Sequence, residues 1–218
     1  MNKTPYLLGT TLMALKYDTG IMIGTDSQTS YGNLIINRSA SKVIKISEKT
    51  MMCRSGSSSD SQYIGNLLKN LNYQYFLERH RNLKIRSVVQ IIRNICYRER
   101  KFSNYGFICC GWDTVHGGQI YSITQGGSIV KQNFALSGSG SIFLNGYIDY
   151  FFSDKLNKDF CKNILLKALS FAVFRDRNSG GIIRICDISK NGLKKQSYFP
   201  YSRIKNTVDI KGSKSILI

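Results

Sequence analysis

Histidine and proline are almost absent from this sequence of 218 residues, which has two of each. With 19 glycines, 42% hydrophobic residues and 20% charged residues, the chain is neither collagen-like nor disordered. Its length suffices for one domain that buries a core without disulfides or metals. Neither His80 nor His116 lies near a candidate nucleophile motif, so a Ser-His-Asp or Cys-His enzyme is poorly supported. Any hydrolytic reaction would need another base.

The six cysteines form no C-x-x-C pair, and we expect neither a metal site nor a cofactor. Most of them lie in apolar runs and are expected to be small core residues, which favours a reducing compartment. They are Cys53, Cys96, Cys109, Cys110, Cys161 and Cys186. No apolar run reaches the ~18 residues of a membrane span, so no membrane partner is expected.

Acidic residues are also scarce, because 13 Asp and Glu stand against 31 Lys and Arg and give a net charge of +18. The excess is concentrated in residues 61–104, with a net charge of +7, and in residues 161–218, with +9. Such a charge suggests a polyanion as partner. However, no helix-turn-helix, zinc-knuckle or RNP-type pattern supports nucleic-acid binding. We expect the basic faces to meet solvent or neighbouring chains, with a basic nucleic-acid-binding protein as the rival hypothesis.

Hydrophobic periodicity predicts strands first, then two helices, strands, two more helices and final strands. The expected strands are 11–15, 21–24, 34–37, 43–46, 51–53, 105–110, 119–123, 128–136, 181–188 and 194–198. Ser59-x-x-Gln62 and Ser87-x-x-Gln90 are typical of capping boxes that begin the first two helices. The other two helices are expected near 142–152 and 158–174. Two mainly antiparallel sheets between helical layers would bury all apolar faces, so the expected fold class is α+β, a four-layer αββα sandwich.

Several short motifs occur in a fixed order along the chain. They are Gly9-Thr10-Thr11, Ile23-Gly24-Thr25-Asp26-Ser27, Lys42, Cys53-Arg54-Ser55-Gly56-Ser57-Ser58, Leu136-Ser137-Gly138-Ser139-Gly140-Ser141 and Arg175-Asp176-Arg177-Asn178-Ser179-Gly180-Gly181. Each motif is weak alone, but in this order and spacing, from about residue 9 to residue 200, they resemble the β-type subunits of the 20S proteasome. The local sequences at 10–14, 53–57 and 111–113 look like the β1, or caspase-like, type.

The resemblance implies an N-terminal nucleophile (Ntn) hydrolase fold and a threonine endopeptidase. In this family the chain is cut before a catalytic threonine, which matches Thr10, so that cleavage would follow Gly9. Residues 1–9 would then be a propeptide, and this chain an unprocessed precursor. Once freed, Thr10 would supply both the nucleophilic hydroxyl and the α-amino base. A free α-amine has a pKa of about 8, which suits proton transfer at neutral pH without a histidine.

The resemblance also implies roles for residues around Thr10. Lys42 matches the active-site lysine, whose positive charge would keep the amine neutral, and Asp26 matches the carboxylate that pairs with and orients it. Gly56 matches the residue whose backbone N–H serves as oxyanion donor. The residues that support Thr10 and its amine are matched by Ser139, Asp176 and Ser179.

Substrate selectivity is implied at Arg54, which matches the position that gives the β1 type its preference for Asp or Glu before the scissile bond. Thr29 and Ser30 match the strand that holds the substrate backbone by β-augmentation. Two departures concern this region. Gln28 stands where the family usually has Arg, and Ser30 replaces a common Thr, but neither change removes a catalytic group.

The sequence thus predicts a β1-type catalytic subunit that cleaves after acidic residues in ATP- and ubiquitin-dependent protein degradation. Residues 10–218 would form one Ntn-hydrolase domain, with 201–218 as a surface tail. Expected partners are other proteasome β subunits in a heteroheptameric ring, the adjacent α ring and polypeptide substrates, without nucleic acid, in cytoplasm and nucleus. The alternative is a non-catalytic structural β-type subunit, against which the joint presence of Thr10, Asp26 and Lys42 argues.

Overall fold

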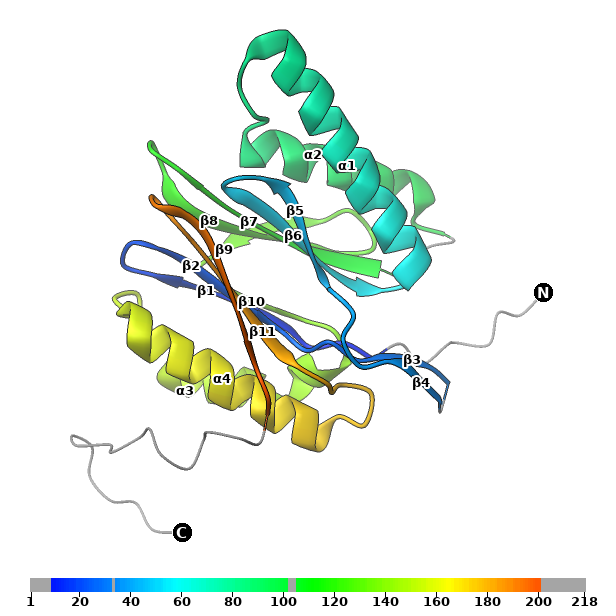
Figure 1. The fold of residues 1–218 in the computed structure, drawn as a ribbon, viewed down its shortest axis with the longest axis vertical. Coiled ribbons are helices and arrows are strands. Elements are labelled where there is room, and N and C mark those ends of the chain that lie inside the picture. The colour runs from blue at the N-terminus through cyan, green and yellow to red at the C-terminus, as the bar shows by residue number, and fades with distance from the viewer. Residues whose placement is uncertain (1–8, 33, 102–104, 201–218) are drawn as a thin grey trace.

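The computed structural model describes residues 9–32, 34–101 and 105–200, and these form four layers. Figure 1 shows two sheets stacked face to face, with a pair of helices covering the outer face of each. The expected α+β sandwich of the αββα type is therefore confirmed. The expected propeptide (1–9, of which only Gly9 is described) and surface tail (201–218) lie almost entirely outside the described residues. No helix in the described part of the chain is long and apolar enough to cross a membrane.

The first sheet has the strand order β10-β1-β2-β11-β12, and all of its pairings are antiparallel. Its strands are β1 (Leu12–Tyr17), β2 (Gly20–Thr25), β10 (Phe134–Ser137), β11 (Ile183–Ser189) and β12 (Gly192–Tyr198). Successive side chains of a strand point to opposite faces. In β1, Leu12 and Ala14 therefore face the second sheet, while Met13 and Leu15 pack toward the helices below.

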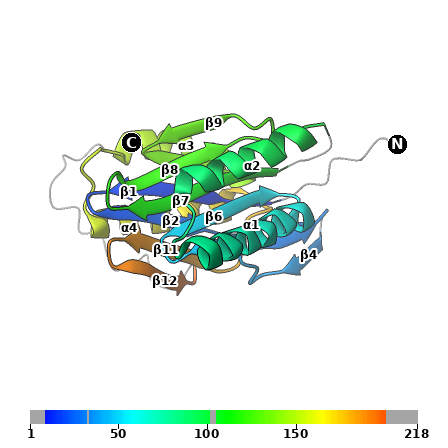
Figure 2. The ribbon, with the colours of Figure 1, turned by 90° about the horizontal axis from the view of Figure 1, so that it is seen from above.

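The second sheet has the order β5-β6-β7-β8-β9, and it too is antiparallel. Its strands are β5 (Val43–Ser47), β6 (Thr50–Gly56), β7 (Tyr105–Asp113), β8 (Gly117–Ile123) and β9 (Ile129–Gln132). The helices α1 (Ser58–Arg79) and α2 (Ile85–Glu99) lie across it, as the view from above makes clear (Figure 2). In α2, Val88, Ile92 and Cys96 recur every four residues and form a fully buried stripe against this sheet.

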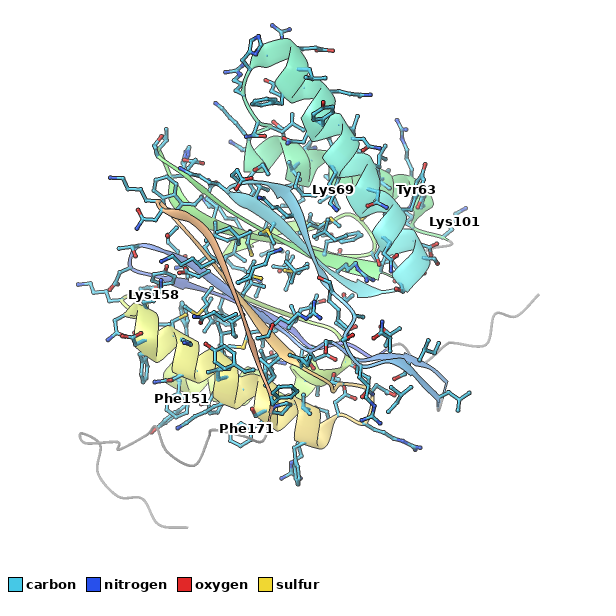
Figure 3. All side chains as sticks on the ribbon, viewed as in Figure 1. Tyr63, Lys69, Lys101, Phe151, Lys158 and Phe171 are labelled. Carbon is cyan, nitrogen blue, oxygen red and sulfur yellow. The ribbon has the colours of Figure 1, made fainter. Side chains whose placement is uncertain are left out.

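The opposite layer consists of α3 (Asn145–Phe151) and α4 (Lys158–Arg175), preceded by a 3-10 turn at Ser139–Phe143. A separate two-stranded ribbon, β3 (Thr29–Tyr31) with β4 (Leu34–Asn37), projects from the end of the sandwich (Figure 1). The labelled side chains in Figure 3 include Tyr63 and Lys69 on one helical layer and Phe171 on the other. All three lie on helices at the outside of the sandwich.

The six cysteines are buried and free, as expected for small core residues. Cys53, Cys110 and Cys186 meet in the cluster between the two sheets, where they pack with Ile23 and Ile108. Burial raises the pKa of the Cys96 thiol to about 11 and that of Cys161 to about 12. These thiols therefore stay protonated at neutral pH and are packing groups rather than nucleophiles.

Two expectations about secondary structure were wrong in detail. The expected strand 128–136 is two strands, β9 and β10, which belong to different sheets and are separated by Asn133. The expected capping boxes are absent, because α1 begins at Ser58 and α2 at Ile85, and neither helix has a side-chain cap. Both helices exist, but they begin earlier than the serine motifs indicate.

Candidate functional site

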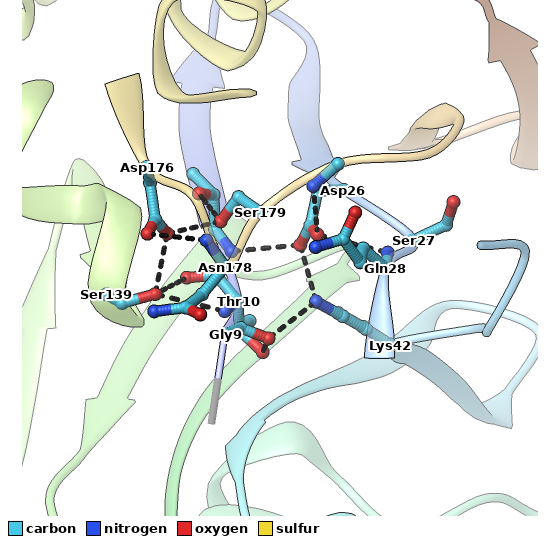
Figure 4. Close-up of polar contacts among 12 residues, drawn as sticks. Gly9, Thr10, Asp26, Ser27, Gln28, Lys42, Ser139, Asp176, Asn178 and Ser179 are labelled. Atoms are coloured by element: carbon cyan, nitrogen blue, oxygen red, sulfur yellow. Dashed lines mark hydrogen bonds and ion pairs between the residues drawn. The ribbon is translucent and has the colours of Figure 1, made fainter. Parts of the chain in front are cut away.

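The motifs that are far apart in the sequence converge at one end of the sandwich (Figure 4). Thr10 lies just before β1, Asp26 just after β2 and Lys42 just before β5. The 3-10 turn that follows β10 and the loop that follows α4 approach from the other side, and they contribute Ser139, Asp176 and Ser179. Antiparallel pairing of β1 with both β2 and β10 brings these ends together.

A buried ion pair lies at the centre of the site. Lys42 Nζ is 2.7 Å from Asp26 Oδ1, and their side chains are 5% and 0% exposed. Three backbone N–H groups also donate to the Asp26 carboxylate, those of Thr11 at 2.9 Å, Gln28 at 3.1 Å and Gly180 at 3.1 Å. A buried charge is tolerated only where it is paired and hydrogen-bonded, and this carboxylate has both kinds of partner.

The carbonyl oxygen of Gly9, in the peptide bond to Thr10, accepts two hydrogen bonds. Thr10 Oγ1 donates to the Gly9 oxygen at 2.5 Å, and Lys42 Nζ donates to the same oxygen at 3.0 Å. The threonine hydroxyl and the lysine ammonium thus both lie beside one carbonyl group. This arrangement can polarise the Gly9 carbonyl and stabilise negative charge on its oxygen.

A chain of hydroxyl groups leads from Thr10 to Asp176. Thr10 N–H donates to Ser139 Oγ at 3.2 Å, and Ser139 in turn donates to Asp176 Oδ2 at 2.7 Å. Ser179 donates to the same carboxylate oxygen at 2.6 Å and lies 2.7 Å from Thr11 Oγ1. Because the Ser179 proton points to Asp176, the Thr11 hydroxyl is the donor in that contact. The network holds both threonines at the start of β1.

Burial shifts the titration of the central pair. Desolvation lowers the pKa of Lys42, the Asp26 carboxylate opposes this shift, and the nearby Arg54 cation adds to it. Desolvation raises the pKa of Asp26, and Lys42 and the backbone donors oppose that shift. The short contact and the three N–H donors favour the charged form of both groups, so we assign the pair as Lys42 ammonium and Asp26 carboxylate.

Arg54 lines a small pocket beside the Gly9–Thr10 bond. The lining residues are Gly9, Thr10, Thr29, Ser30, Lys42, Arg54, Gly56 and Ser58. Arg54 is 7% exposed, and its guanidinium donates to Ser58 Oγ, Ser61 Oγ and the Ser41 carbonyl. No carboxylate of the described residues forms a salt bridge with Arg54, and its buried Nε has no hydrogen-bond partner among them. The pocket therefore holds a buried cation whose charge is not neutralised by a direct partner.

Gly56 ends β6 with φ of 85°, which is a backbone conformation that favours glycine. The Arg54 N–H donates to the Lys42 carbonyl at 3.0 Å, on the β5 side of the strand. N–H groups alternate along a strand, so the Gly56 N–H points to that same side, beyond the start of β5 at Val43. This is the side on which the pocket lies.

The structure thus brings all the residues expected to form the site to one end of the fold, including Thr29 and Ser30 on the ribbon. The sequence assigned no role to Thr11, which binds the Asp26 carboxylate through its N–H and Ser179 through its hydroxyl, or to Gly180, whose N–H also binds Asp26. It also missed Ser58 and Ser61, which hold the Arg54 guanidinium. Four of these five contacts use backbone N–H groups or serines of a helix start, for which residue type gives little signal.

Comparison with known proteins agrees with the fold. Residues 6–188 match the family model described as Proteasome subunit, and the chain belongs to this family. It is similar to Proteasome subunit beta type-6 of Dictyostelium discoideum, with 40% identity over 87% of this chain and 88% of that protein. It is also similar to Proteasome subunit beta type-1 of Saccharomyces cerevisiae, with 30% identity over 92% of this chain and 93% of that protein. Proteasome subunit beta type-9 of Homo sapiens is similar too, with 32% identity over 85% of this chain and 84% of that protein.

The chain is accordingly a β-type proteasome subunit, and its partners are other proteasome β subunits and the adjacent α ring. The relatives carry three different type numbers. Their names therefore do not assign one type to this chain.

Proposed function

We propose that this chain is a catalytic β1-type subunit, a threonine endopeptidase that cuts peptide bonds after acidic residues. The observation that carries the proposal is the Gly9 carbonyl oxygen, which accepts from Thr10 Oγ1 at 2.5 Å and from Lys42 Nζ at 3.0 Å. Lys42 is itself bound to the buried Asp26. A non-catalytic subunit would have no need of a buried ammonium aimed at this one carbonyl group.

The first reaction is removal of residues 1–9. The Thr10 hydroxyl oxygen bonds to the Gly9 carbonyl carbon while its proton passes to a water molecule. Lys42 stabilises the negative charge that develops on the Gly9 oxygen. The bond from the Gly9 carbon to the Thr10 nitrogen then breaks, the nitrogen takes up a proton, and an ester links Gly9 to Thr10 Oγ1. Water hydrolyses the ester and leaves a free α-amine on Thr10.

The second reaction is peptide hydrolysis by the processed site. The α-amine of Thr10 takes the hydroxyl proton as the oxygen attacks a substrate carbonyl, and it returns a proton to the leaving amine as the carbon–nitrogen bond breaks. Water, deprotonated by the same amine, then hydrolyses the ester left on Thr10 Oγ1 and restores the hydroxyl. Ser139, held by Asp176, lies 3.2 Å from the nitrogen that becomes this amine and orients it. The Lys42 ammonium favours the neutral form of the amine. The Gly56 N–H is the oxyanion donor for the new tetrahedral intermediate.

Selectivity for acidic residues follows from Arg54. A buried guanidinium without a carboxylate partner attracts an anionic substrate side chain that enters the pocket. The ion pair that forms offsets the loss of hydration of both the guanidinium and the substrate carboxylate. Thr29 and Ser30 line the same pocket and hold the substrate backbone as an added strand. In the cell, the subunit would act in ATP- and ubiquitin-dependent degradation in cytoplasm and nucleus.

Intact mass of the subunit in assembled particles tests this proposal. We expect the chain to begin at Thr10, because autocleavage is the reaction that the Gly9 arrangement supports. A chain that retains Met1 or Gly9 in the assembled particle would support the non-catalytic alternative, since a blocked nitrogen cannot act as base. Cleavage of a fluorogenic peptide ending in Asp, absent in particles that carry Thr10→Ala, gives the second readout.

A further inference from the structure

Gln28 is a buried residue that contacts three separate parts of the site. It is 5% exposed and lies between the end of β2 and the start of β3. Its backbone N–H donates to Asp26 Oδ2 at 3.1 Å. Its side-chain Nε2 donates to Ser30 Oγ at 3.2 Å and to the Arg177 carbonyl at 3.3 Å. One amide group therefore joins the strand that lines the pocket to the loop that carries Asp176 and Ser179.

The amide is held in place by close packing against the loop. A Cβ atom added at Gly180 would lie 2.3 Å from Gln28 Oε1 and 3.1 Å from its Cδ, so the carboxamide rests on the Gly180 backbone. The Gly180 N–H donates to Asp26 Oδ2, the oxygen that also accepts from the Gln28 N–H. The position of the amide is thus tied to that of the carboxylate at the centre of the site.

The ribbon that Gln28 holds has little support of its own. Within the described part of the chain, β3 pairs only with β4, with a break in register between Thr29 and Ser30. The side chains of Leu34, Ile35 and Ile36 in β4 are between 44% and 71% exposed, so β4 packs against little of the described chain. Isolated two-stranded ribbons are marginally stable. An anchor at the start of β3 is therefore needed to keep its free edge in one position.

The anchor brings no charge into the site. The charged side chains that contact or line the site are Asp26, Lys42, Arg54 and Asp176, whose formal charges cancel. A cation at position 28 would add a positive charge beside Asp26 and compete with Lys42 for it. The neutral amide supplies two donors and leaves the Lys42–Asp26 pair unchanged.

We propose that Gln28 is a positioning residue for extended substrates: its side-chain amide fixes β3 against the 176–181 loop, so that the free edge of β3 can pair with the substrate backbone. This inference rests on the proposed peptidase function. It concerns how the substrate strand is held, whereas Arg54 governs which side chain is preferred. The two roles predict different kinetic effects.

Gln28→Met tests the proposal, because methionine has a similar length and no donor. In assembled particles we compare two fluorogenic peptides that end in Asp, a dipeptide and a tetrapeptide, after subtracting the rate of Thr10→Ala particles. Loss of one buried and one partly buried hydrogen bond should raise KM for the tetrapeptide about five- to tenfold with a smaller change in kcat. The advantage of the tetrapeptide over the dipeptide should largely disappear, while the preference for Asp over Asn stays.

Two further variants keep the test decisive. Gln132→Met is the matched control, because Gln132 in β9 also donates to a serine hydroxyl, that of Ser122 at 2.9 Å, and it lies in a strand outside the site. It should leave the tetrapeptide advantage unchanged. Ser30→Ala removes one acceptor of the amide, so as a single variant it should reduce the advantage of the tetrapeptide over the dipeptide. In the double variant with Gln28→Met, the further reduction caused by Ser30→Ala should be smaller than its effect as a single variant.

The outcomes separate the inference from the function on which it rests. If wild-type particles show no Thr10-dependent cleavage after Asp, the proposed function is wrong. If they do cleave, and the tetrapeptide advantage survives in Gln28→Met, the positioning role is wrong. Should Gln28→Met fail to assemble, an unchanged advantage in Ser30→Ala would overturn the inference equally.

Discussion

Replacing Arg54 by glutamine should remove the preference for acidic residues and leave autocleavage intact. The guanidinium lies in the pocket beside Thr10 with no carboxylate partner among the described residues, and its Nε has no hydrogen-bond partner there. Glutamine keeps a polar group of similar reach but carries no charge. Peptides that end in Asp and in Asn are nearly isosteric, so the ratio of their kcat/KM values isolates the contribution of charge.

The size of the effect follows from the contacts. A hydrogen bond to a charged group contributes about 1.5–3 kcal/mol net, which corresponds to about 10- to 150-fold in kcat/KM. The bare Coulomb attraction at ~4 Å and an effective dielectric constant of ~20 is about 4 kcal/mol, which is an upper bound because both groups lose hydration. We therefore expect the Asp-to-Asn ratio to fall about 10- to 100-fold. Intact mass should still show a chain that begins at Thr10.

Arg184→Gln is the matched control for this variant. Arg184 in β11 is also partly buried, its Nε has no hydrogen-bond partner among the described residues, and its Nη2 donates to the Ser39 carbonyl at 2.5 Å. It does not line the pocket beside Thr10, so its loss should leave the ratio unchanged. An Asp-to-Asn ratio in Arg54→Gln particles equal to that of the wild type would refute the electrostatic reasoning.

Three other predictions follow from the same geometry. Thr10→Ala should abolish both release of residues 1–9 and cleavage after Asp, and cleavage that persists would reject the nucleophile. The proposed autocleavage needs a protonated Lys42 beside the Gly9 oxygen, and burial lowers the pKa of Lys42 below the ordinary lysine value of 10.5. The rate of autocleavage in precursor particles, followed by mass, should therefore already decline as the pH rises toward 10.5. Arg54→Gln removes a like charge and should move this decline to higher pH, whereas a shift to lower pH would contradict the assignment. Gly9→Ala should slow autocleavage and lower the stability of the precursor by about 1–3 kcal/mol, while Gly126→Ala, with no atom within 4 Å of the added Cβ, should do neither.

The layered fold was accessible from sequence because most elements follow simple periodicity. The break between β9 and β10 was not, since 128–136 is continuous in β propensity and only the tertiary structure separates it. At Asn133 the chain leaves the second sheet, and the Asn133 carbonyl accepts from Lys16 N–H in β1 at 2.8 Å. Partner strands, rather than residue types, decide where one sheet ends and the other begins.

The serine motif before α1 misled the assignment of the helix start for a related reason. Serine is favoured at helix starts because its hydroxyl can cap free backbone N–H groups. Here Ser59 caps no backbone N–H of the helix, whereas the hydroxyls of its neighbours Ser58 and Ser61 accept from the Arg54 guanidinium, and Ser61 also donates to the Ser57 carbonyl at 2.5 Å. The local pattern at Ser59 signals a cap, whereas the folded chain uses the adjacent serines to hold a cation in the pocket.

The order of the motifs predicted which residues meet, but not how the Gly9–Thr10 peptide bond is held. A Cβ atom added at Gly9 would lie 1.9 Å from the Asn178 backbone oxygen, a distance that no side chain can adopt without displacing the loop after α4. That loop also carries the Asp176 and Ser179 side chains that bind Ser139 and support Thr11. The absence of a side chain at position 9 therefore lets the loop lie directly against the Gly9–Thr10 peptide bond. In that position the loop completes the hydrogen bonds around Thr10, so the residue at position 9 is constrained by the packing of the site.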